Sequence, residues 1–164
     1  TNSYSLSHIA RYVATLANRG NCYDLTLLDK LTETDGTLIQ EYEPALHNQV
    51  QIADSSWNAV QQGIRLVAEN TKSLNVLSDL GLNVAGKTGT AQQSKSHPNH
   101  ALFVGFAPYE SPEIAIAVRI ANGYTSANCA EVGADVFKYY FNLADEAEIV
   151  SGTASGSTGQ TIGD

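Results

Sequence analysis

The chain has 164 residues, of which 43% are hydrophobic and 8% aromatic, as expected for one globular domain with its own core. Its formal net charge of −8, without a local Lys/Arg cluster, argues against nucleic acid as a partner. No apolar run approaches the roughly 18 residues that a transmembrane helix needs. The two cysteines, Cys22 and Cys129, have no metal-ligand spacing. Because methionine is absent, we expect the chain to be a processed or excised piece of a longer protein, unless a start residue was simply removed.

The first element predicted is an amphipathic helix over residues 5–19, with Ser5 as its N-cap and Gly20 as its stop. Its apolar stripe consists of Leu6, Ile9, Ala10, Val13, Leu16 and Ala17. Residues 24–43 then predict a β-hairpin, because two strand-like runs flank Asp35-Gly36, a dipeptide suited to a tight turn.

A second helix is predicted after residues 54–56 and ends near Asn70. The spacing of its apolar residues predicts an inward face made of Trp57, Val60, Ile64 and Val67. The outward face is expected to carry Gln61, Gln62, Arg65 and Glu69.

Three strand-like runs follow, at residues 84–92, 100–107 and 114–121, and their short connections favour antiparallel pairing. A last helix is predicted after Ser126, with an apolar stripe of Ala130, Ala134, Phe137, Phe141 and Ala144. The fold class is therefore α+β, an antiparallel sheet with flanking helices. We expect residues 1–145 to form the folded part and residues 146–164, rich in Gly, Ser and Thr, to form a flexible tail.

One segment, GLNVAGKTGTAQ at residues 81–92, fits two different active-site motifs. Gly81, four residues and then Gly86-Lys87-Thr88 match a phosphate-binding loop. That loop needs a buried strand before it and a helix directly after it, and neither neighbour fits. The other motif is the Lys-Thr-Gly strand of penicillin-binding proteins and serine β-lactamases, here Lys87 to Thr90. A surface turn without chemistry remains possible on these four letters alone.

The strand interpretation gives each residue a chemical use. Alternation places Thr88 and Thr90 on one face and Lys87 and Gly89 on the other. Two hydroxyl donors beside a positive charge suit a substrate carboxylate. Gly89 leaves space where another element approaches, and an unpaired Thr90 N–H could donate to an oxyanion.

The ordered pieces of the chain resemble the C-terminal part of the transpeptidase domain of class B, monofunctional penicillin-binding proteins. In chain order, the similar pieces are SLSHIARYVATLANRG, SWNAVQQGIRLV, AGKTGTAQ, HALFVGFAP and PEIAIAVRIANG. The likeness runs from about residue 3 to 143. Ile64 stands where methionine is common in the family, and Leu102 replaces a tryptophan that is commoner there. The second change removes a packing residue and not a reacting one.

The resemblance implies a partial penicillin-binding transpeptidase fold, similar to the serine β-lactamases. In that family the serine of a Ser-x-x-Lys motif attacks peptidoglycan stem peptides ending in D-Ala-D-Ala, and β-lactam antibiotics acylate the same serine. Carried over by position, Lys87 would orient and polarise the site, Thr88, Gly89 and Thr90 would bind the substrate, and the Thr90 N–H would complete the oxyanion hole.

The resemblance also implies partners and a location. The partners are the stem peptides, β-lactams, the remainder of a parent transpeptidase chain and a cell-wall synthesis complex. The implied location is the extracytoplasmic face of the bacterial cytoplasmic membrane, with the parent protein anchored there. No cofactor and no metal are implied.

The family's nucleophile is missing from these 164 residues, because no lysine has a serine three positions before it. Ser-x-Asn triplets occur at 56–58, 73–75 and 126–128, but the family's second motif precedes the first helix. We therefore predict that the chain alone has no transpeptidase activity and forms no covalent penicillin adduct. A non-catalytic β-lactam-sensing or assembly module with the same fold is the alternative.

Two further expectations concern the surface. The family's sheet has five strands, and the start of the domain supplies two of them, so strand 114–121 is expected to be an edge that could pair with a second copy of the chain. His97 and His100 form a His-x-x-His pair beside Pro98. Because the sequence places no further ligands nearby, we expect a solvated loop here and no metal.

Overall fold

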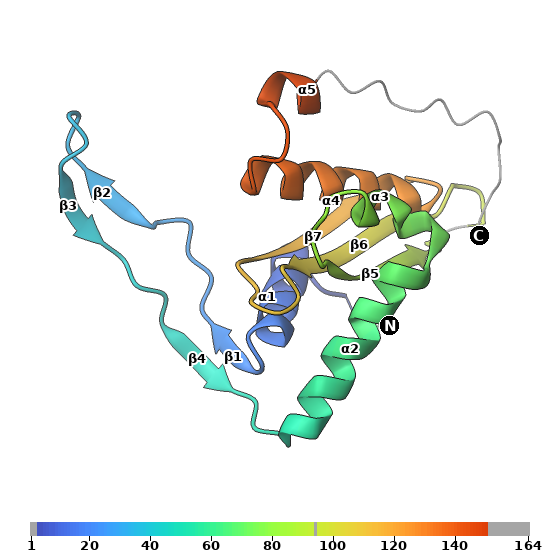
Figure 1. The fold of residues 1–164 in the computed structure, drawn as a ribbon, viewed down its shortest axis with the longest axis horizontal. Helices are drawn as coiled ribbons and strands as arrows, with labels where there is room; N and C mark the ends of the chain where they lie inside the picture. Colours follow the sequence, from blue (N-terminus) through green and yellow to red (C-terminus); the bar gives the residue numbers. More distant parts are fainter. Residues whose placement is uncertain (1–2, 94, 151–164) are drawn as a thin grey trace.

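A three-stranded antiparallel sheet between helices forms the centre of the chain in the computed structural model, which describes residues 3–93 and 95–150 (Figure 1). Its strands lie in the order β5 (Ala85–Ala91), β6 (His100–Ala107) and β7 (Ile114–Ile120). The main helices are α1 (Leu6–Ala17), α2 (Asp54–Asn70) and α4 (Ser126–Tyr140). The α+β class and all three strands predicted from the sequence are confirmed.

The two faces of the sheet are covered by different helices. Phe103 and Phe106 are both fully buried, and strand alternation sends them to opposite faces. Phe103 belongs to the larger core with α4, whereas Phe106 packs with Val13 and Ala17 of α1. Helix α2 packs along β5, the strand that carries the Lys-Thr-Gly motif.

Helix α1 begins after the predicted N-cap and ends at Ala17, two residues before the predicted end at residue 19. The Ser5 side chain accepts a hydrogen bond from the His8 backbone N–H, which caps the first turn. Gly20 follows the helix with a φ of 104°, and its N–H donates to the carbonyl of Thr15 at 2.8 Å. The predicted stripe reaches the core from Ile9 onward, whereas Leu6 is 41% exposed.

Helix α2 confirms the predicted length and most of the predicted inward face, with two exceptions at Val60 and Gln61. Gln61 is buried, with 7% of its surface exposed, whereas Val60 is 41% exposed. The predictions for these two residues were wrong, whereas those for Trp57, Ile64 and Val67 are confirmed. The observed inward stripe is Trp57, Gln61, Ile64, Val67 and Ala68. The reason is that the Gln61 amide has backbone partners on α1, described below, so that burial leaves it satisfied.

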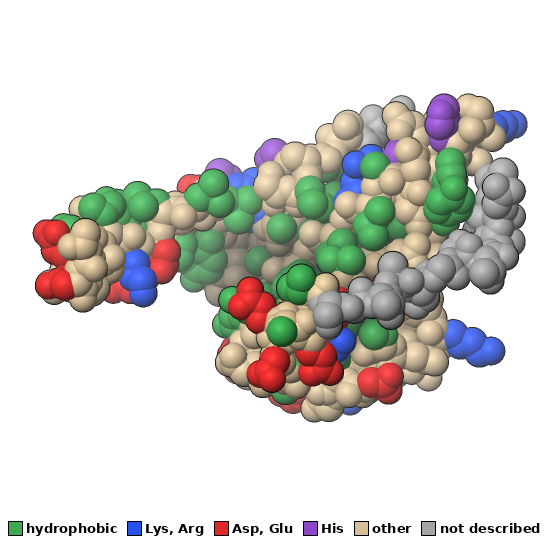
Figure 2. All heavy atoms as spheres, turned by 90° about the horizontal axis from the view of Figure 1, so that it is seen from above, with side chains coloured by type: hydrophobic (Ala, Val, Ile, Leu, Met, Phe, Trp, Pro, Cys, Tyr) green, Lys and Arg blue, Asp and Glu red, His purple; other side chains and the backbone are tan. Residues whose placement is uncertain are grey.

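The predicted hairpin is confirmed, and it is longer than expected. Four short strands form an arm that projects from the sheet (Figure 1): β2 (Lys30–Thr32) pairs with β3 (Leu38–Glu41), and β1 (Asn21–Tyr23) pairs with β4 (Leu46–Gln49). At the turn, the Thr37 backbone N–H donates to the Asp35 carboxylate at 2.9 Å and lowers the pKa of Asp35. Acidic side chains gather at the tip of the arm, and hydrophobic ones lie along it (Figure 2).

Short helices complete the chain. A 3-10 turn, η1 (Lys72–Leu74), and helix α3 (Asn75–Ser78) connect α2 to β5. The last helix is confirmed as α4, but it ends at Tyr140, before Phe141 and Ala144 of the predicted stripe. A further helix, α5 (Glu146–Val150), contacts it. The structure thus differs from the predicted tail at 146–150, while 151–164 lie outside the described residues. None of the described helices has the length and apolar character needed to cross a membrane.

Candidate functional site

The motif Lys87 to Thr90 lies in the middle of β5, an edge strand of the sheet. A phosphate-binding loop would require Gly86-Lys87-Thr88 to form a loop followed by a helix. Residues Ala85–Ala91 are instead one continuous strand that pairs with β6 along its whole length. The nucleotide interpretation is therefore wrong, and the strand interpretation of the motif is confirmed.

The register of β5 against β6 places the motif side chains on two faces. Thr90 lies opposite Ala101 and Thr88 opposite Phe103, so both hydroxyls are on the α4 side of the sheet. Lys87 and Gly89 alternate with them and point to the α1 side. This is the alternation that the sequence predicts.

The polar groups of the motif are largely available at the surface. Lys87 is exposed, and its Nζ donates to the carbonyl oxygen of Thr88 at 2.6 Å. Thr90 is exposed and Thr88 half-buried, and neither hydroxyl forms a hydrogen bond within residues 3–93 and 95–150. A strand residue directs its N–H and C=O to the same side, so Thr88 and Thr90 present their backbone groups to the same edge. The two hydroxyls can therefore bind a ligand without breaking a hydrogen bond among residues 3–93 and 95–150.

Gly89 has no structural reason to be glycine within the described chain. A Cβ atom at this position would lie 3.6 Å from Leu102 Cβ, an ordinary van der Waals contact. At Gly86, in the same strand, an added Cβ would approach the Phe103 ring to 2.7 Å. Gly86 is thus required by the core, whereas the space above Gly89 is open to something outside these contacts.

The start of β5 is held by a polar cluster between α2 and the β6–β7 turn. Arg65 pairs with Glu69 at 2.7 Å and lies over the Tyr109 ring at 5.1 Å. The Asn83 side chain donates to Glu110 at 2.6 Å, and the Tyr109 backbone N–H donates to the Asn83 carbonyl. These contacts fix the chain just before the motif strand.

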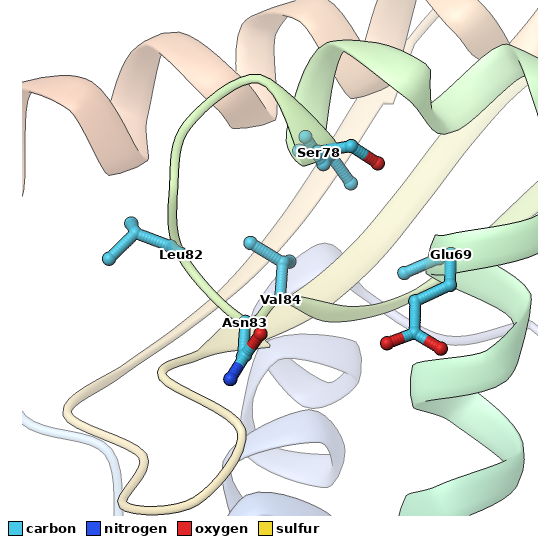
Figure 3. A pocket seen from close by; sticks show the side chains of 7 residues that line it. Glu69, Ser78, Leu82, Asn83 and Val84 are labelled. Atoms are coloured by element: carbon cyan, nitrogen blue, oxygen red, sulfur yellow. The ribbon is translucent and has the colours of Figure 1, made fainter.

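A hollow of about 180 Å³ opens beside this cluster, as Figure 3 shows. Glu69 of α2, Ser78 at the end of α3, and Leu82, Asn83 and Val84 of the connecting loop line it. It contains none of the motif residues, so it belongs to the support of β5 and not to the candidate site.

A second supporting cluster, which the sequence did not predict, joins α1 to α2. The buried Gln61 amide donates to the carbonyls of Leu16 and Ala17 at 2.9 and 3.0 Å. Arg19, with a φ of 59°, donates to Gln61 Oε1 and forms an ion pair with Asp54 at 3.0 Å. The one sequence signal was the Asn-Arg-Gly turn after α1, which does not reveal the partner on α2.

His100 lies at the start of the strand predicted at 100–107, but it is not part of a solvated loop as expected for the His-x-x-His pair. It is the first residue of β6, is half-buried, and has hydrogen bonds at both ring nitrogens. His97 remains exposed in the loop, where its Nδ1 contacts Ser96 Oγ at 3.1 Å. No group of three or more His, Cys, Asp or Glu side chains suited to a metal occurs in the described part of the chain.

Strand β7 is the other edge of the sheet, as predicted, since β6 is its only strand partner among the described residues. Helix α1 packs against this strand and contacts it more than any other strand. The outer edge of β7 is therefore open to backbone pairing in the part of the molecule that the structure describes.

Comparisons with known proteins agree with this geometry. Residues 2–141 match the family model of the penicillin binding protein transpeptidase domain. Penicillin-binding protein 2B of Streptococcus pneumoniae is 30% identical over 154 residues, which cover 87% of this chain and 22% of that protein. Penicillin-binding protein 2A of Bacillus subtilis is 28% identical over 90% of this chain and 23% of that protein. The chain thus spans less than a quarter of the length of these relatives.

Solved structures show the same relationship. The structure of penicillin-binding protein 2B from Streptococcus pneumoniae superimposes with a TM-score of 0.71 at 26% identity, covering 93% of this chain and 26% of that one. Pseudomonas aeruginosa PBP2 in complex with WCK 5153 gives a TM-score of 0.64 at 29% identity, over 97% of this chain and 33% of that one. With the motif strand, its open edge and the matched order of elements, the chain belongs to the transpeptidase domain family of the penicillin-binding proteins, as part of a class B domain.

Proposed function

We propose that this chain is the C-terminal part of a peptidoglycan D,D-transpeptidase and supplies the strand that binds the substrate. The Haemophilus influenzae relative, 28% identical over 82% of this chain, is a peptidoglycan D,D-transpeptidase. One observation carries the proposal: β5 is an exposed edge strand whose Lys87-Thr88-Gly89-Thr90 sequence is not explained by packing at Gly89. A site built for a ligand accounts for that glycine, whereas a structural strand does not.

Each motif residue has a role in this function. The hydroxyls of Thr88 and Thr90 would donate to the carboxylate of a stem peptide ending in D-Ala-D-Ala, or to that of a β-lactam. Lys87 would add positive charge beside them after its ammonium leaves the Thr88 carbonyl. The Thr90 N–H, at the same edge as Thr88, would stabilise the oxyanion that forms when a serine attacks the substrate carbonyl.

The chain contains the substrate-binding strand but not the nucleophilic serine. None of its five lysines, at positions 30, 72, 87, 95 and 138, follows a serine by three positions. In this proposal the serine comes from the remainder of a parent transpeptidase, located at the extracytoplasmic face of the membrane within a cell-wall synthesis complex. A second copy pairing at β7 is a further partner that the open edge allows.

The proposal is tested by acylation with a labelled penicillin in a protein that carries this chain together with its Ser-x-x-Lys segment. Thr90→Val keeps the side-chain shape and removes one donor to the carboxylate. A hydrogen bond to a charged group contributes roughly 1.5 to 3 kcal/mol, so the acylation rate should fall about 10- to 100-fold. Thr32→Val on the exposed arm strand β2 is the matched control and should leave the rate unchanged.

Gly89→Ala separates a ligand site from a structural strand. Because the added Cβ fits the described structure, the melting temperature should change by less than about 2 °C. The acylation rate should nevertheless fall, since the methyl group lies on the face opposite the Thr88 and Thr90 hydroxyls and occupies the space through which the element that carries the serine would approach the strand. A Gly89→Ala protein that is acylated at the normal rate, or a Thr90→Val protein that is, would contradict the proposed function.

A further inference from the structure

Three separate segments meet at the His100 side chain. Its Nε2 lies 2.6 Å from Oε1 of Gln93, in the loop that leaves β5. Its Nδ1 lies 3.0 Å from the backbone nitrogen of Asn122, in the turn between β7 and α4. His100 itself begins β6 and pairs with Ala91, the last residue of β5.

These two contacts define the protonation state of the ring. A backbone N–H can only donate, so Nδ1 must be the acceptor from Asn122. Nε2 then carries the proton and donates to the Gln93 carbonyl oxygen. A doubly protonated ring would place an N–H against the Asn122 N–H, so the arrangement requires a neutral imidazole in one tautomer.

The turn that holds His100 is itself closely packed. Asn122 and Tyr124 have φ angles of 53° and 62°, and the Tyr124 N–H donates to the carbonyl of Asn99, the neighbour of His100. An added Cβ at Gly123 would approach the Ala101 and Ile120 side chains to 2.9 Å. The turn therefore provides a firm anchor to which His100 attaches the loop after β5.

This anchor acts on the end of the motif strand. Gln93 follows Thr90 by only three positions, so fixing Gln93 limits how far the chain after Thr90 can move. His100 also lies on the same face of the sheet as Gly89, since both alternate with Ala101 and Thr90 in the register. His100 is not itself aligned with the motif hydroxyls, which lie on the opposite face.

We propose that His100 is a positioning residue: as the Nε2-protonated imidazole it ties the loop after β5 to the β7–α4 turn and so fixes the Thr90 end of the substrate-binding strand. This role rests on the proposed function of β5 for its effect on acylation, but the tie itself is a property of this chain.

The tautomer is tested by nitrogen NMR of the histidine rings in the 164-residue chain at a pH where His100 is neutral. We expect a protonated Nε2 and an unprotonated Nδ1 in His100, as a single form. His97 serves as the internal reference for an exposed ring. The opposite tautomer in His100, or a mixture like that of His97, would overturn the proposal.

The positioning role is tested in the same chain with variants that remove one or both of the His100 hydrogen bonds. His100→Ala removes both contacts and should speed hydrogen exchange of the Asn122 amide about 5-fold, the change expected for one ordinary hydrogen bond. It should also shift the amide signals of Gln93 and Thr90. His100→Asn, whose Oδ1 can replace Nδ1, should restore protection at Asn122 but not the Gln93 signal. His97→Ala is the matched control and should leave Thr90 unchanged.

An unchanged Thr90 signal in His100→Ala, or an equal change in His97→Ala, would overturn the positioning role. In the longer protein that carries the serine, His100→Ala should lower the penicillin acylation rate about 5-fold at a temperature where the variant is fully folded, with His97→Ala at the normal rate. Unaltered acylation in His100→Ala would overturn the catalytic consequence. If the longer protein without substitutions is not acylated at all, the proposed function fails. The NMR results on this chain still decide whether His100 connects Gln93 to Asn122.

Discussion

Replacing Gln61 by methionine tests why helix α2 faces the way it does. Methionine keeps the volume and flexibility of the side chain but removes its two hydrogen bonds to the carbonyls of Leu16 and Ala17. At about 1 kcal/mol for each bond, and with Gln61 only 7% exposed, the free energy of unfolding should fall by about 2 kcal/mol. The bond from Arg19 adds little, because Arg19 keeps Asn58 and Asp54 as partners.

The loss can be followed by urea denaturation, because Trp57 is the single tryptophan, is 6% exposed and lies one turn before Gln61. For a chain of this size a loss of about 2 kcal/mol corresponds to a melting temperature lower by roughly 4 to 8 °C. Gln62→Met, at the exposed neighbouring position, is the control and should stay within about 0.5 kcal/mol. If Gln61→Met were as stable as Gln62→Met, the account of the α1–α2 contact would be refuted.

Two other substitutions test the structure at separate points. Gly20→Ala should destabilise the fold by about 3 kcal/mol or more, because Gly20 has a φ of 104° and an added Cβ would meet the Val50 carbonyl and the Trp57 ring. A urea denaturation midpoint equal to that of the unsubstituted chain would contradict this prediction. Burial raises the pKa of the Cys129 thiol, so the stability linked to it is fully present below about pH 8.5 and is lost as the pH rises through the raised value. Unfolding free energies measured from pH 7 to 10 should therefore fall more steeply in the natural chain than in Cys129→Ala, and parallel curves would show that Cys129 contributes nothing.

The sheet and its motif strand could be predicted because their signals are local. The strands at residues 84–92, 100–107 and 114–121 differ from the observed ones by at most one residue at either end. In α1, the cap at Ser5 and the stop at Gly20 each act within a few residues of the helix end. Such features depend on neighbours in the sequence, so the sequence contains what is needed to place them.

The errors occurred where a distant partner decides the outcome. Gln61 is buried because its partners lie 44 and 45 residues earlier, and nothing near Gln61 in the sequence identifies them. His100 is held by Asn122, 22 residues later, so its ring could be read only as part of a polar loop. The pair at the base of the arm, β1 with β4, joins residues 21–23 to 46–49 through short strands that lack an alternating pattern.

Some features of the candidate site could likewise be predicted from local sequence, and one could not. The alternation of Lys87, Thr88, Gly89 and Thr90 followed from the strand alone and is confirmed by the register with β6. The open space at Gly89 could be recognised only in three dimensions, because Gly86 in the same strand is a glycine for a different reason. Packing thus distinguishes a glycine that the core requires from one that a ligand site explains.

The most direct test of the account is the intact mass of two proteins after incubation with a labelled penicillin: this 164-residue chain, and the product of a full gene that contains it. We predict no covalent adduct on the chain alone, since it has the substrate-binding strand but no Ser-x-x-Lys motif, and one adduct on the longer protein. An adduct on the chain alone would contradict the assignment of the nucleophile to another segment. No adduct on either protein would contradict the transpeptidase function and favour a non-catalytic module.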